Sequence, residues 1–241
     1  MALHLHTSRW EQQMKEAVKR VGGRALAYTP KFLQTYIKET VELMFWKREL
    51  TRSNGNFYNG HFQEFFTDLF DLKKEYFDSK RMLDVGCGPL GSLEWATGAA
   101  ERVGVDPLAD KYRDLNKGVH AMQYVNAASE ALPFADGAFD VVSMFNSLDH
   151  VEDADATIGE VQRVLANGGD LLLICEIDHE PTLTEPQTLR EDILEKFGTC
   201  RVEMKKIFAI NDDHNVYASI SQARARASGH PGILCARLVK N

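Results

Sequence analysis

The sequence has 241 residues, of which 44% are hydrophobic and 26% are charged, with a formal net charge of −7. This balance is typical of a globular protein and excludes a disordered or fibrous chain. Residues 1–52 carry an excess of basic side chains, whereas residues 101–200 are strongly acidic. Because nucleic-acid binding requires a basic surface, we expect no nucleic-acid partner.

Cysteine usage and the absence of apolar runs indicate the compartment. Cys87, Cys175, Cys200 and Cys235 show neither C-x-x-C nor the Cys/His spacing of a zinc site, which favours a reducing environment without a structural metal. The N-terminus, MALHLHTSRW, lacks the pattern of a secretory signal. No apolar run reaches the roughly 20 residues that span a bilayer. We expect a cytoplasmic protein with no membrane partner.

Residues 1–80 have helical patterns and are predicted to form an N-terminal helical cap or lid. A capping-box pattern at residues 8–11 precedes apolar residues at helical spacing up to Val21. Thr29, as N-cap, and Pro30 open a second predicted helix. Its apolar stripe comprises Phe32, Tyr36, Ile37, Val41 and Met44. A third predicted helix places one apolar face on Phe62, Phe65, Phe66, Leu69 and Phe70.

From residue 81 onward, short apolar strands alternate with segments compatible with helices. The strands are expected at residues 81–85, 101–106, 120–125, 139–145 and 169–176, with helical segments at 92–100, 109–116 and 155–166. This alternation predicts an α/β fold with a doubly wound, mostly parallel sheet. Residues 201–210 and 232–240 are predicted as a C-terminal antiparallel hairpin, which completes seven strands.

Residues 83–91, LDVGCGPLG, contain three glycines at the G-x-G-x-x-G spacing of nucleotide-binding turns. Gly86 and Gly88 would let the backbone approach a ligand, and Gly91 would let a following helix pack closely. This spacing alone fits nicotinamide and other nucleotides equally well. Asp84, however, would repel a pyrophosphate by roughly a few kcal/mol at an effective dielectric constant near 20. It suits a phosphate-free cation such as S-adenosylmethionine (SAM).

Four segments in order resemble the motifs of class I SAM-dependent methyltransferases. RMLDVGCGPLGSLEWA is similar to the family's first motif, and Asp106 in RVGVDP falls where the family holds both ribose hydroxyls. NAASEALPFADGAFDVV is similar to the third-strand loop, and EVQRVLANGGDLLL to the segment before strand five. The resemblance covers about residues 81–176. It implies a SAM-binding methyltransferase domain over residues 81–241.

The resemblance also implies the residues of the cofactor site. They are Asp84, Gly86, Cys87, Gly88, Asp106, Pro107, Leu108, Ser129, Glu130 and Asn146. Where many relatives have Asp-Ala-Glu before Leu-Pro, this chain has Ala128-Ser129-Glu130. Adenine contact would therefore depend on Ser129 or Glu130, and a solvated loop acid is an equal alternative for Glu130. Pro107 and Leu108 could form a wall against adenine or belong to the core.

The loop after the fourth strand supplies the candidate catalytic residues. His150, in FNSLDHVED, is placed to act as a general base, and Asp149 could pair with it or hold an ammonium group. His179, after the fifth strand, is a substrate-side candidate, although surface loop acids and their neighbours are the alternative there. A lid over the cofactor is predicted at Tyr58, Asn59 and His61.

The leading hypothesis is a SAM-dependent methyltransferase acting on a small molecule, such as a hydroxyl of a natural product or sugar. N-methylation of a small amine is the nearest alternative. An NAD(P)-dependent oxidoreductase could use the same glycine spacing, and a SAM-binding protein without catalysis would keep the turn but not the base. The oligomeric state cannot be predicted from these patterns.

Overall fold

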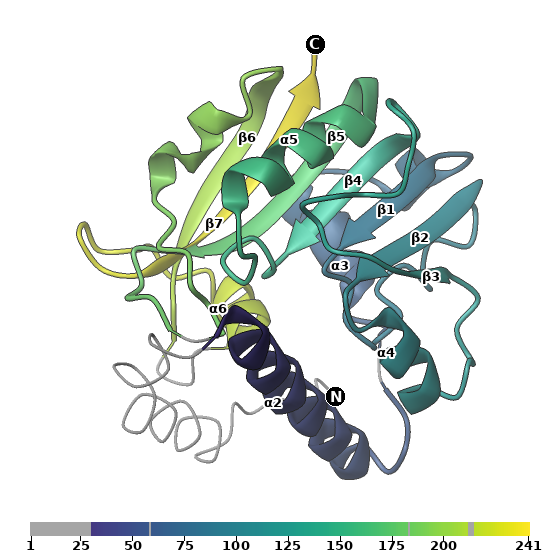
Figure 1. The fold of residues 1–241 in the computed structure, drawn as a ribbon. Coiled ribbons are helices and arrows are strands. Elements are labelled where there is room, and N and C mark those ends of the chain that lie inside the picture. The colour runs from purple at the N-terminus through teal and green to yellow at the C-terminus, as the bar shows by residue number, and fades with distance from the viewer. Residues whose placement is uncertain (1–29, 58, 183, 212–214) are drawn as a thin grey trace.

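The computed structural model describes residues 30–241 except residues 58, 183 and 212–214 (Figure 1). The first predicted helix, Thr29 and Tyr58 lie outside the described residues. A seven-stranded sheet with the order β3-β2-β1-β4-β5-β7-β6 forms the centre of the molecule. The carboxyl ends of its parallel strands meet at the edge along which the N-terminal helix α2 lies (Figure 1).

Five strands of the sheet pair in parallel, as the alternation predicted. They are β1 (Arg81–Val85), β2 (Glu101–Asp106), β3 (Gln123–Asn126), β4 (Phe139–Phe145) and β5 (Leu165–Ile177). The last strand, β7 (Gly232–Lys240), runs antiparallel to β5 and to β6 (Cys200–Ala209). The predicted fold class is confirmed, including the antiparallel C-terminal pair.

A separate hydrophobic cluster covers each face of the sheet. Helix α5 (Ala154–Val164) packs Ile158, Val161 and Val164 on one face. Aromatic side chains of α3 (Phe62–Phe66) and of the 3-10 helix η2 (Asp68–Phe70) cover the other face. Because the central strands are buried on both sides, their sequences are almost continuously apolar. The prediction that Phe62 and Phe65 to Phe70 present an apolar face to the domain is confirmed.

Phe66 occupies the centre of the second cluster. Its side chain is fully buried, and its ring packs against Phe145, Trp95 and Phe77 with centroid distances of 4.6, 5.1 and 6.1 Å. We expect Phe66→Ala to lower the free energy of unfolding by about 3–5 kcal/mol because it leaves a cavity among rigid rings. Urea denaturation measures this. Phe32→Ala, at a side chain that is 72% exposed, is the control and should change stability by less than about 0.5 kcal/mol.

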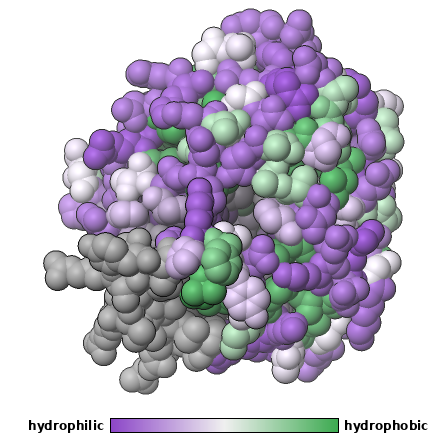
Figure 2. Space-filling model, viewed as in Figure 1, coloured by the Kyte–Doolittle hydropathy of each residue, from purple (hydrophilic) through white to green (hydrophobic). Residues whose placement is uncertain are grey.

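Helix α2 (Lys31–Arg52) confirms the second predicted helix, but three residues of its apolar stripe are exposed. Phe32, Tyr36 and Met44 are 72%, 67% and 51% exposed, and Figure 2 shows apolar side chains at the surface where α2 lies. Lys38 and Trp46, eight residues apart, contact the domain instead.

Two connections also differ from the expectation. Residues 92–100 form successive turns rather than a helix. Gly91 has φ +73°, and a Cβ at Gly98 would lie 1.9 Å from Asp78 Oδ1, so the chain turns tightly against its neighbours. The C-terminal strands are not a simple hairpin, because helix α6 (Val216–Gln222) lies between them in the chain. The remaining elements are α4 (Ala109–Leu115) and the 3-10 helices η3 (Lys74–Phe77) and η4 (Glu191–Lys196).

Candidate functional site

The glycine turn after β1 lies against the loop that follows β4. Gly86 has φ +76°, and a Cβ there would lie 2.4 Å from the Cβ of Ser147. Ser147 donates a hydrogen bond from Oγ to the carbonyl of Val85 at 2.8 Å. Gly88 also has a positive φ, of 54°. The backbone conformation and the close contact with Ser147 therefore both require glycine at position 86.

Asp84 is buried beneath this turn, where serine hydroxyls bind both of its oxygens. Ser143 Oγ on β4 donates to Oδ1 at 2.6 Å, and Ser92 Oγ donates to Oδ2. Burial raises the pKa of Asp84 to about 6, and the two hydroxyls partly oppose the shift. Asp84 thus ties β1 to β4 and to the segment after the turn. Neither serine was singled out from the sequence.

Asp106, at the end of β2, is held in place by two backbone amides. Its Oδ1 accepts from Leu108 N at 2.8 Å and its Oδ2 from Gly88 N at 3.3 Å. Burial, followed by the nearby charge of Glu42, raises the pKa of Asp106 to about 7. The carboxylate therefore links β2 to the glycine turn and sits in an environment that favours added hydrogen-bond donors.

The other predicted residues around this turn differ in accessibility. Leu108 is buried in the protein, whereas Pro107 is exposed. Cys87 is buried, and burial raises the pKa of its thiol, so this side chain is a neutral packing group. Pro107 thus remains available as a wall for a ligand, while the Leu108 and Cys87 side chains belong largely to the protein interior.

A polar cluster lies at the loop after β4 and the end of β5. Asp149, which is 1% exposed, has its Oδ2 3.9 Å from His150 Nε2 and 3.7 Å from His179 Nε2. Burial is the largest cause of the raised pKa of Asp149, and the two histidines oppose it. Asp149 Oδ1, both Nε2 atoms and Asn146 Oδ1 are buried and lack hydrogen-bond partners within the described part of the chain. Such atoms are costly unless a ligand or water binds them.

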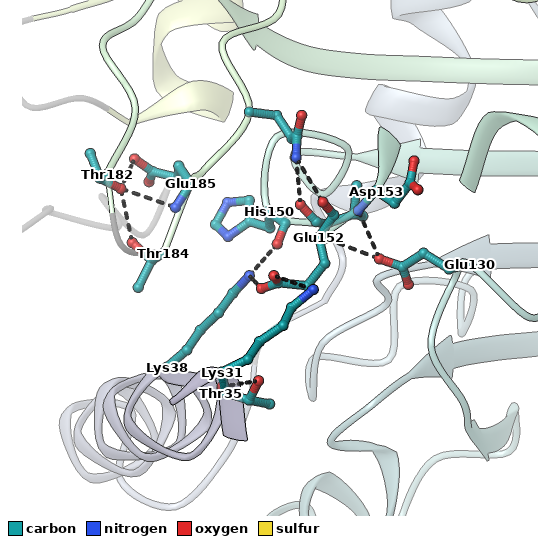
Figure 3. Close-up of polar contacts among 12 residues, drawn as sticks. Lys31, Thr35, Lys38, Glu130, His150, Glu152, Asp153, Thr182, Thr184 and Glu185 are labelled. Carbon is teal, nitrogen blue, oxygen red and sulfur yellow. Dashed lines mark hydrogen bonds and ion pairs between the residues drawn. The ribbon is translucent and has the colours of Figure 1, made fainter. Parts of the chain in front are cut away.

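Ser129 and Glu130 have partners inside the protein. Glu130 Oε1 accepts from the backbone amides of Glu152 and Asp153 at 3.0 and 3.2 Å (Figure 3). Ser129 Oγ lies 3.0 Å from Thr157 Oγ1. Glu130 therefore binds the backbone at the start of α5. A contact of either residue with adenine stays a prediction.

Helix α2 crosses the carboxyl edge and contacts both halves of the sheet. Lys38 Nζ donates to the carbonyl of His150 and lies 3.6 Å from Glu152 Oε1, and Lys31 also reaches Glu152 (Figure 3). On the other half, Tyr112 Oη donates to Glu42 Oε1 at 2.8 Å. These contacts place α2 over the region between the β4 loop and the end of β2.

Two of the predicted lid residues, Asn59 and His61, lie at the start of α3. His61 packs against Tyr217 of α6 with a ring-centroid distance of 5.7 Å, and burial lowers its pKa to about 4. Burial, followed by the charge of Asp84, raises the pKa of Tyr217, so these rings are close to the floor of the turn. Asn59 accepts the backbone amide of Phe62 at 3.1 Å through its carbonyl. Tyr217 was missed because α6 was not predicted.

Two cavities in the described structure lie elsewhere. One of about 510 Å³ is lined by Asp136, Arg163 and Lys240, at the opposite edge of the sheet. The other, of about 360 Å³, lies between α5 and η4 and is lined by Gln187 and Leu189 among others. Neither cavity touches the glycine turn. Helix α2 covers that turn with Trp46, whose Cζ2 atom lies 3.5 Å from the position that a Cβ of Gly88 would take.

A family model described as a methyltransferase domain matches residues 83–173. The match spans the glycine turn, Asp106 and the loop with Asp149 and His150. Residues 83–173 therefore contain a methyltransferase domain. The match confirms the resemblance seen in the sequence, and a SAM-dependent methyltransferase family implies SAM as the cofactor. That the glycine turn of this methyltransferase domain binds SAM stays a prediction.

Solved structures share the fold of this methyltransferase domain. An S-adenosylmethionine-dependent methyltransferase from Mesorhizobium loti has a TM-score of 0.54 at 17% identity, covering 70% of this chain and 99% of that one. A methyltransferase solved with the Trm112 activator of Haloferax volcanii has a TM-score of 0.54 at 18% identity, covering 68% and 83% of the two chains.

Curated relatives match part of this chain over part of their own length. The ubiquinone/menaquinone biosynthesis C-methyltransferase UbiE of Shewanella frigidimarina is 46% identical over 65 residues, 27% of this chain and 25% of its own. The uncharacterized methyltransferase YcgJ of Bacillus subtilis is 27% identical over 134 residues, 48% of this chain and 53% of its own. The chain thus spans about a quarter and about half of the lengths of these relatives.

Two features of the described residues bear on membrane and metal binding. None of the helices there is both long and apolar enough to cross a membrane. Within the same residues, no three side chains of His, Cys, Asp or Glu are arranged to hold a metal ion.

Proposed function

We propose that this protein transfers the methyl group of SAM to the hydroxyl of a small molecule, with His150 as the general base. The observation that carries this proposal is the buried Asp149 between two histidines whose Nε2 atoms lack hydrogen-bond partners within the described residues. When bound, SAM supplies an electrophilic methyl carbon. An alcohol or phenol must also lose a proton, which a histidine can accept.

In this proposal, each residue of the cluster has a defined task. His150 Nε2 would accept the hydroxyl proton, and bound SAM would supply the methyl group and leave as S-adenosylhomocysteine. Asp149 stabilises the resulting imidazolium, because a buried carboxylate within 4 Å favours a positive charge beside it. Asn146 Oδ1, which is buried and directed by a backbone with φ +53°, is available to bind a donor of the acceptor or of the cofactor. His179 lines the acceptor side.

A hydroxyl acceptor is favoured over the alternatives by this same cluster. An amine that is already neutral needs little more than positioning, so it would not explain a base with a buried carboxylate partner. The similarity to a C-methyltransferase covers a quarter of that protein and does not decide the acceptor. A sugar or natural-product hydroxyl is thus the proposed acceptor class.

Two measurements test the proposal. Calorimetry with S-adenosylhomocysteine measures cofactor binding, and methyl-labelled SAM with a panel of small alcohols, phenols and amines measures transfer. We expect binding, and transfer to a hydroxyl that depends on His150. Binding without transfer to any acceptor of the panel would favour a SAM-binding protein without catalysis. Binding of NADH with no binding of S-adenosylhomocysteine would restore the oxidoreductase hypothesis.

The N-terminal residues are proposed to cover the bound cofactor. Residues 1–80 form the cap and residues 81–241 the methyltransferase domain in this division, although α3 and η2 already belong to the hydrophobic core of the domain. Within the described residues, α2 is the covering element, and Asn59 and His61 lie at the start of α3. A cytoplasmic location and a small-molecule partner complete the proposal.

Replacing Lys38 tests whether α2 acts as a lid. Lys38→Met keeps the aliphatic chain but removes the donor to the His150 carbonyl, and the Lys38 side chain is only 17% exposed. We expect S-adenosylhomocysteine to dissociate about tenfold faster, as for loss of one charged hydrogen bond. Stopped-flow fluorescence measures the rate. Lys31→Met is the matched control, because the Lys31 side chain is 79% exposed and lies 3.8 Å from the same Glu152. It should change the dissociation rate of S-adenosylhomocysteine by less than about threefold.

A further inference from the structure

Helix α2 presents two charged residues and a tryptophan, at helical spacing, to the edge of the sheet that carries the candidate site. Lys38, Glu42 and Trp46 are four residues apart, so they lie on one face of the helix. Lys38 contacts the carbonyl of His150, and Trp46 lies near Gly88. Glu42, between them, is therefore held over the space between the glycine turn and the end of β2. This acid was not singled out from the sequence.

The carboxylate of Glu42 is oriented by a buried tyrosine. Tyr112, which is fully buried on α4, donates from Oη to Glu42 Oε1 at 2.8 Å. Tyr112 also lies within electrostatic reach of Asp106, since the charges of Glu42 and Asp106 both act on it. Two carboxylates, one from α2 and one from β2, therefore face the same small region.

Two facing carboxylates in a partly buried site repel each other unless hydrogen-bond donors lie between them. The donors already present are the amides of Gly88 and Leu108 on Asp106 and the hydroxyl of Tyr112 on Glu42. Each carboxylate keeps lone pairs that these donors do not use. A vicinal diol carries two O–H donors on adjacent carbons and can bridge such a pair.

We propose that Glu42 is a second carboxylate of the ribose subsite, so that the cofactor's vicinal diol binds between Glu42 on α2 and Asp106 on β2. This inference rests on SAM as the cofactor. In this arrangement the ligand neutralises the repulsion between α2 and the domain, because each hydroxyl donates to one carboxylate. Cofactor binding and docking of α2 then stabilise each other.

The test compares S-adenosylhomocysteine with its 2′-deoxy and 3′-deoxy counterparts by calorimetry. For Glu42→Gln we expect affinity for S-adenosylhomocysteine to fall about tenfold, as for loss of one charged hydrogen bond. One of the two deoxy ligands should show no further loss in this variant, because the hydroxyl that Glu42 accepts is already missing. Glu39→Gln, on the same helix and 3.1 Å from exposed Lys111, is the matched control and should bind like the wild type.

Three outcomes separate this inference from the cofactor assignment. No binding of S-adenosylhomocysteine by the wild type would overturn the cofactor assignment and this inference together. Normal or tighter binding by Glu42→Gln would overturn this inference alone, since it would show that Glu42 only repels Asp106. The inference would also be overturned if, for both deoxy ligands, the loss of affinity caused by the missing hydroxyl adds fully to the loss caused by Glu42→Gln. Circular dichroism spectra of the wild type and of Glu42→Gln, recorded before the binding measurements, check that the two proteins fold alike.

Discussion

Replacing His150 with glutamine is expected to lower kcat by about 10²–10⁴-fold while leaving S-adenosylhomocysteine binding within about twofold of the wild type. Glutamine keeps a polar side chain of similar length but cannot accept the acceptor's proton. The 32% exposed imidazole contributes little to packing, so the fold should survive the change. Single-turnover transfer from labelled SAM measures the chemical step directly.

The pH profile separates loss of a base from a structural effect. Wild-type kcat should rise with pH as the base loses its proton, whereas the residual rate of His150→Gln should rise only as the acceptor itself ionises. Asp149→Asn should lower kcat but keep the rise of kcat with pH, because Asp149 acts through the His150 imidazole and not on the acceptor. If His150→Gln retains both the wild-type rate and profile, His150 is not the base.

His179→Gln is the informative comparison within the same cluster. His179 lies as near to Asp149 as His150 does, with Nε2 3.7 Å from Oδ2. We expect this variant to raise KM for the acceptor with a smaller effect on kcat, since His179 is proposed to line the acceptor side. A larger loss of kcat in His179→Gln than in His150→Gln would exchange the two roles.

Much of the fold was predictable because its signals are local. Each central strand is buried on both faces, so an apolar run such as residues 139–145 marks it without knowledge of its partners. The glycine turn was predictable for a similar reason, since the positive φ at Gly86 requires that residue. Residues 92–100 were predicted as helix because their composition is compatible with one. Their turns pack instead against Asp78 and Asp84, which lie outside the segment.

The parts of the site that come from α2 and α6 were not predictable in this way. The exposed apolar residues of α2 gave a stronger periodic signal than Lys38, Glu42 and Trp46, although the latter face the domain. An apolar stripe identifies the inner face only when the surface beneath it is apolar too. Tyr217 was missed because α6 is a seven-residue helix, too short for a clear period. The cluster around Asp149 was partly found, since strand ends of a parallel sheet meet at one edge.

Asp106→Asn is expected to weaken S-adenosylhomocysteine binding by about 100-fold or more. Both oxygens of Asp106 accept backbone amides, at 2.8 Å from Leu108 and 3.3 Å from Gly88. An asparagine must direct its NH₂ group toward one of these N–H donors, so the variant loses the charge and disturbs the turn. Asp110→Asn, at a side chain that is 60% exposed and paired with Arg113, is the control and should bind normally. Affinity unchanged in Asp106→Asn would refute the ribose assignment.

The pH dependence of binding follows from the same carboxylate. In the unliganded protein the pKa of Asp106 is raised to about 7 by burial and by Glu42, so below pH 7 the group is largely protonated. Because the folded state then holds a proton that the unfolded chain releases near its ordinary pKa of 3.8, unliganded stability falls as pH rises from about 4 to 7.

Ligand hydroxyls that donate to the ionised form lower this pKa, so binding below pH 7 must expel a proton. Affinity should consequently rise about tenfold per pH unit up to pH 7 and become constant above it. Asp84, whose pKa is about 6, contributes only to the lower part of this rise. Calorimetry in buffers of different ionisation enthalpy counts the released proton directly. In Asp106→Asn the rise of affinity between pH 6 and 7 should disappear. If the rise persists in this variant, the proton released on binding comes from another group.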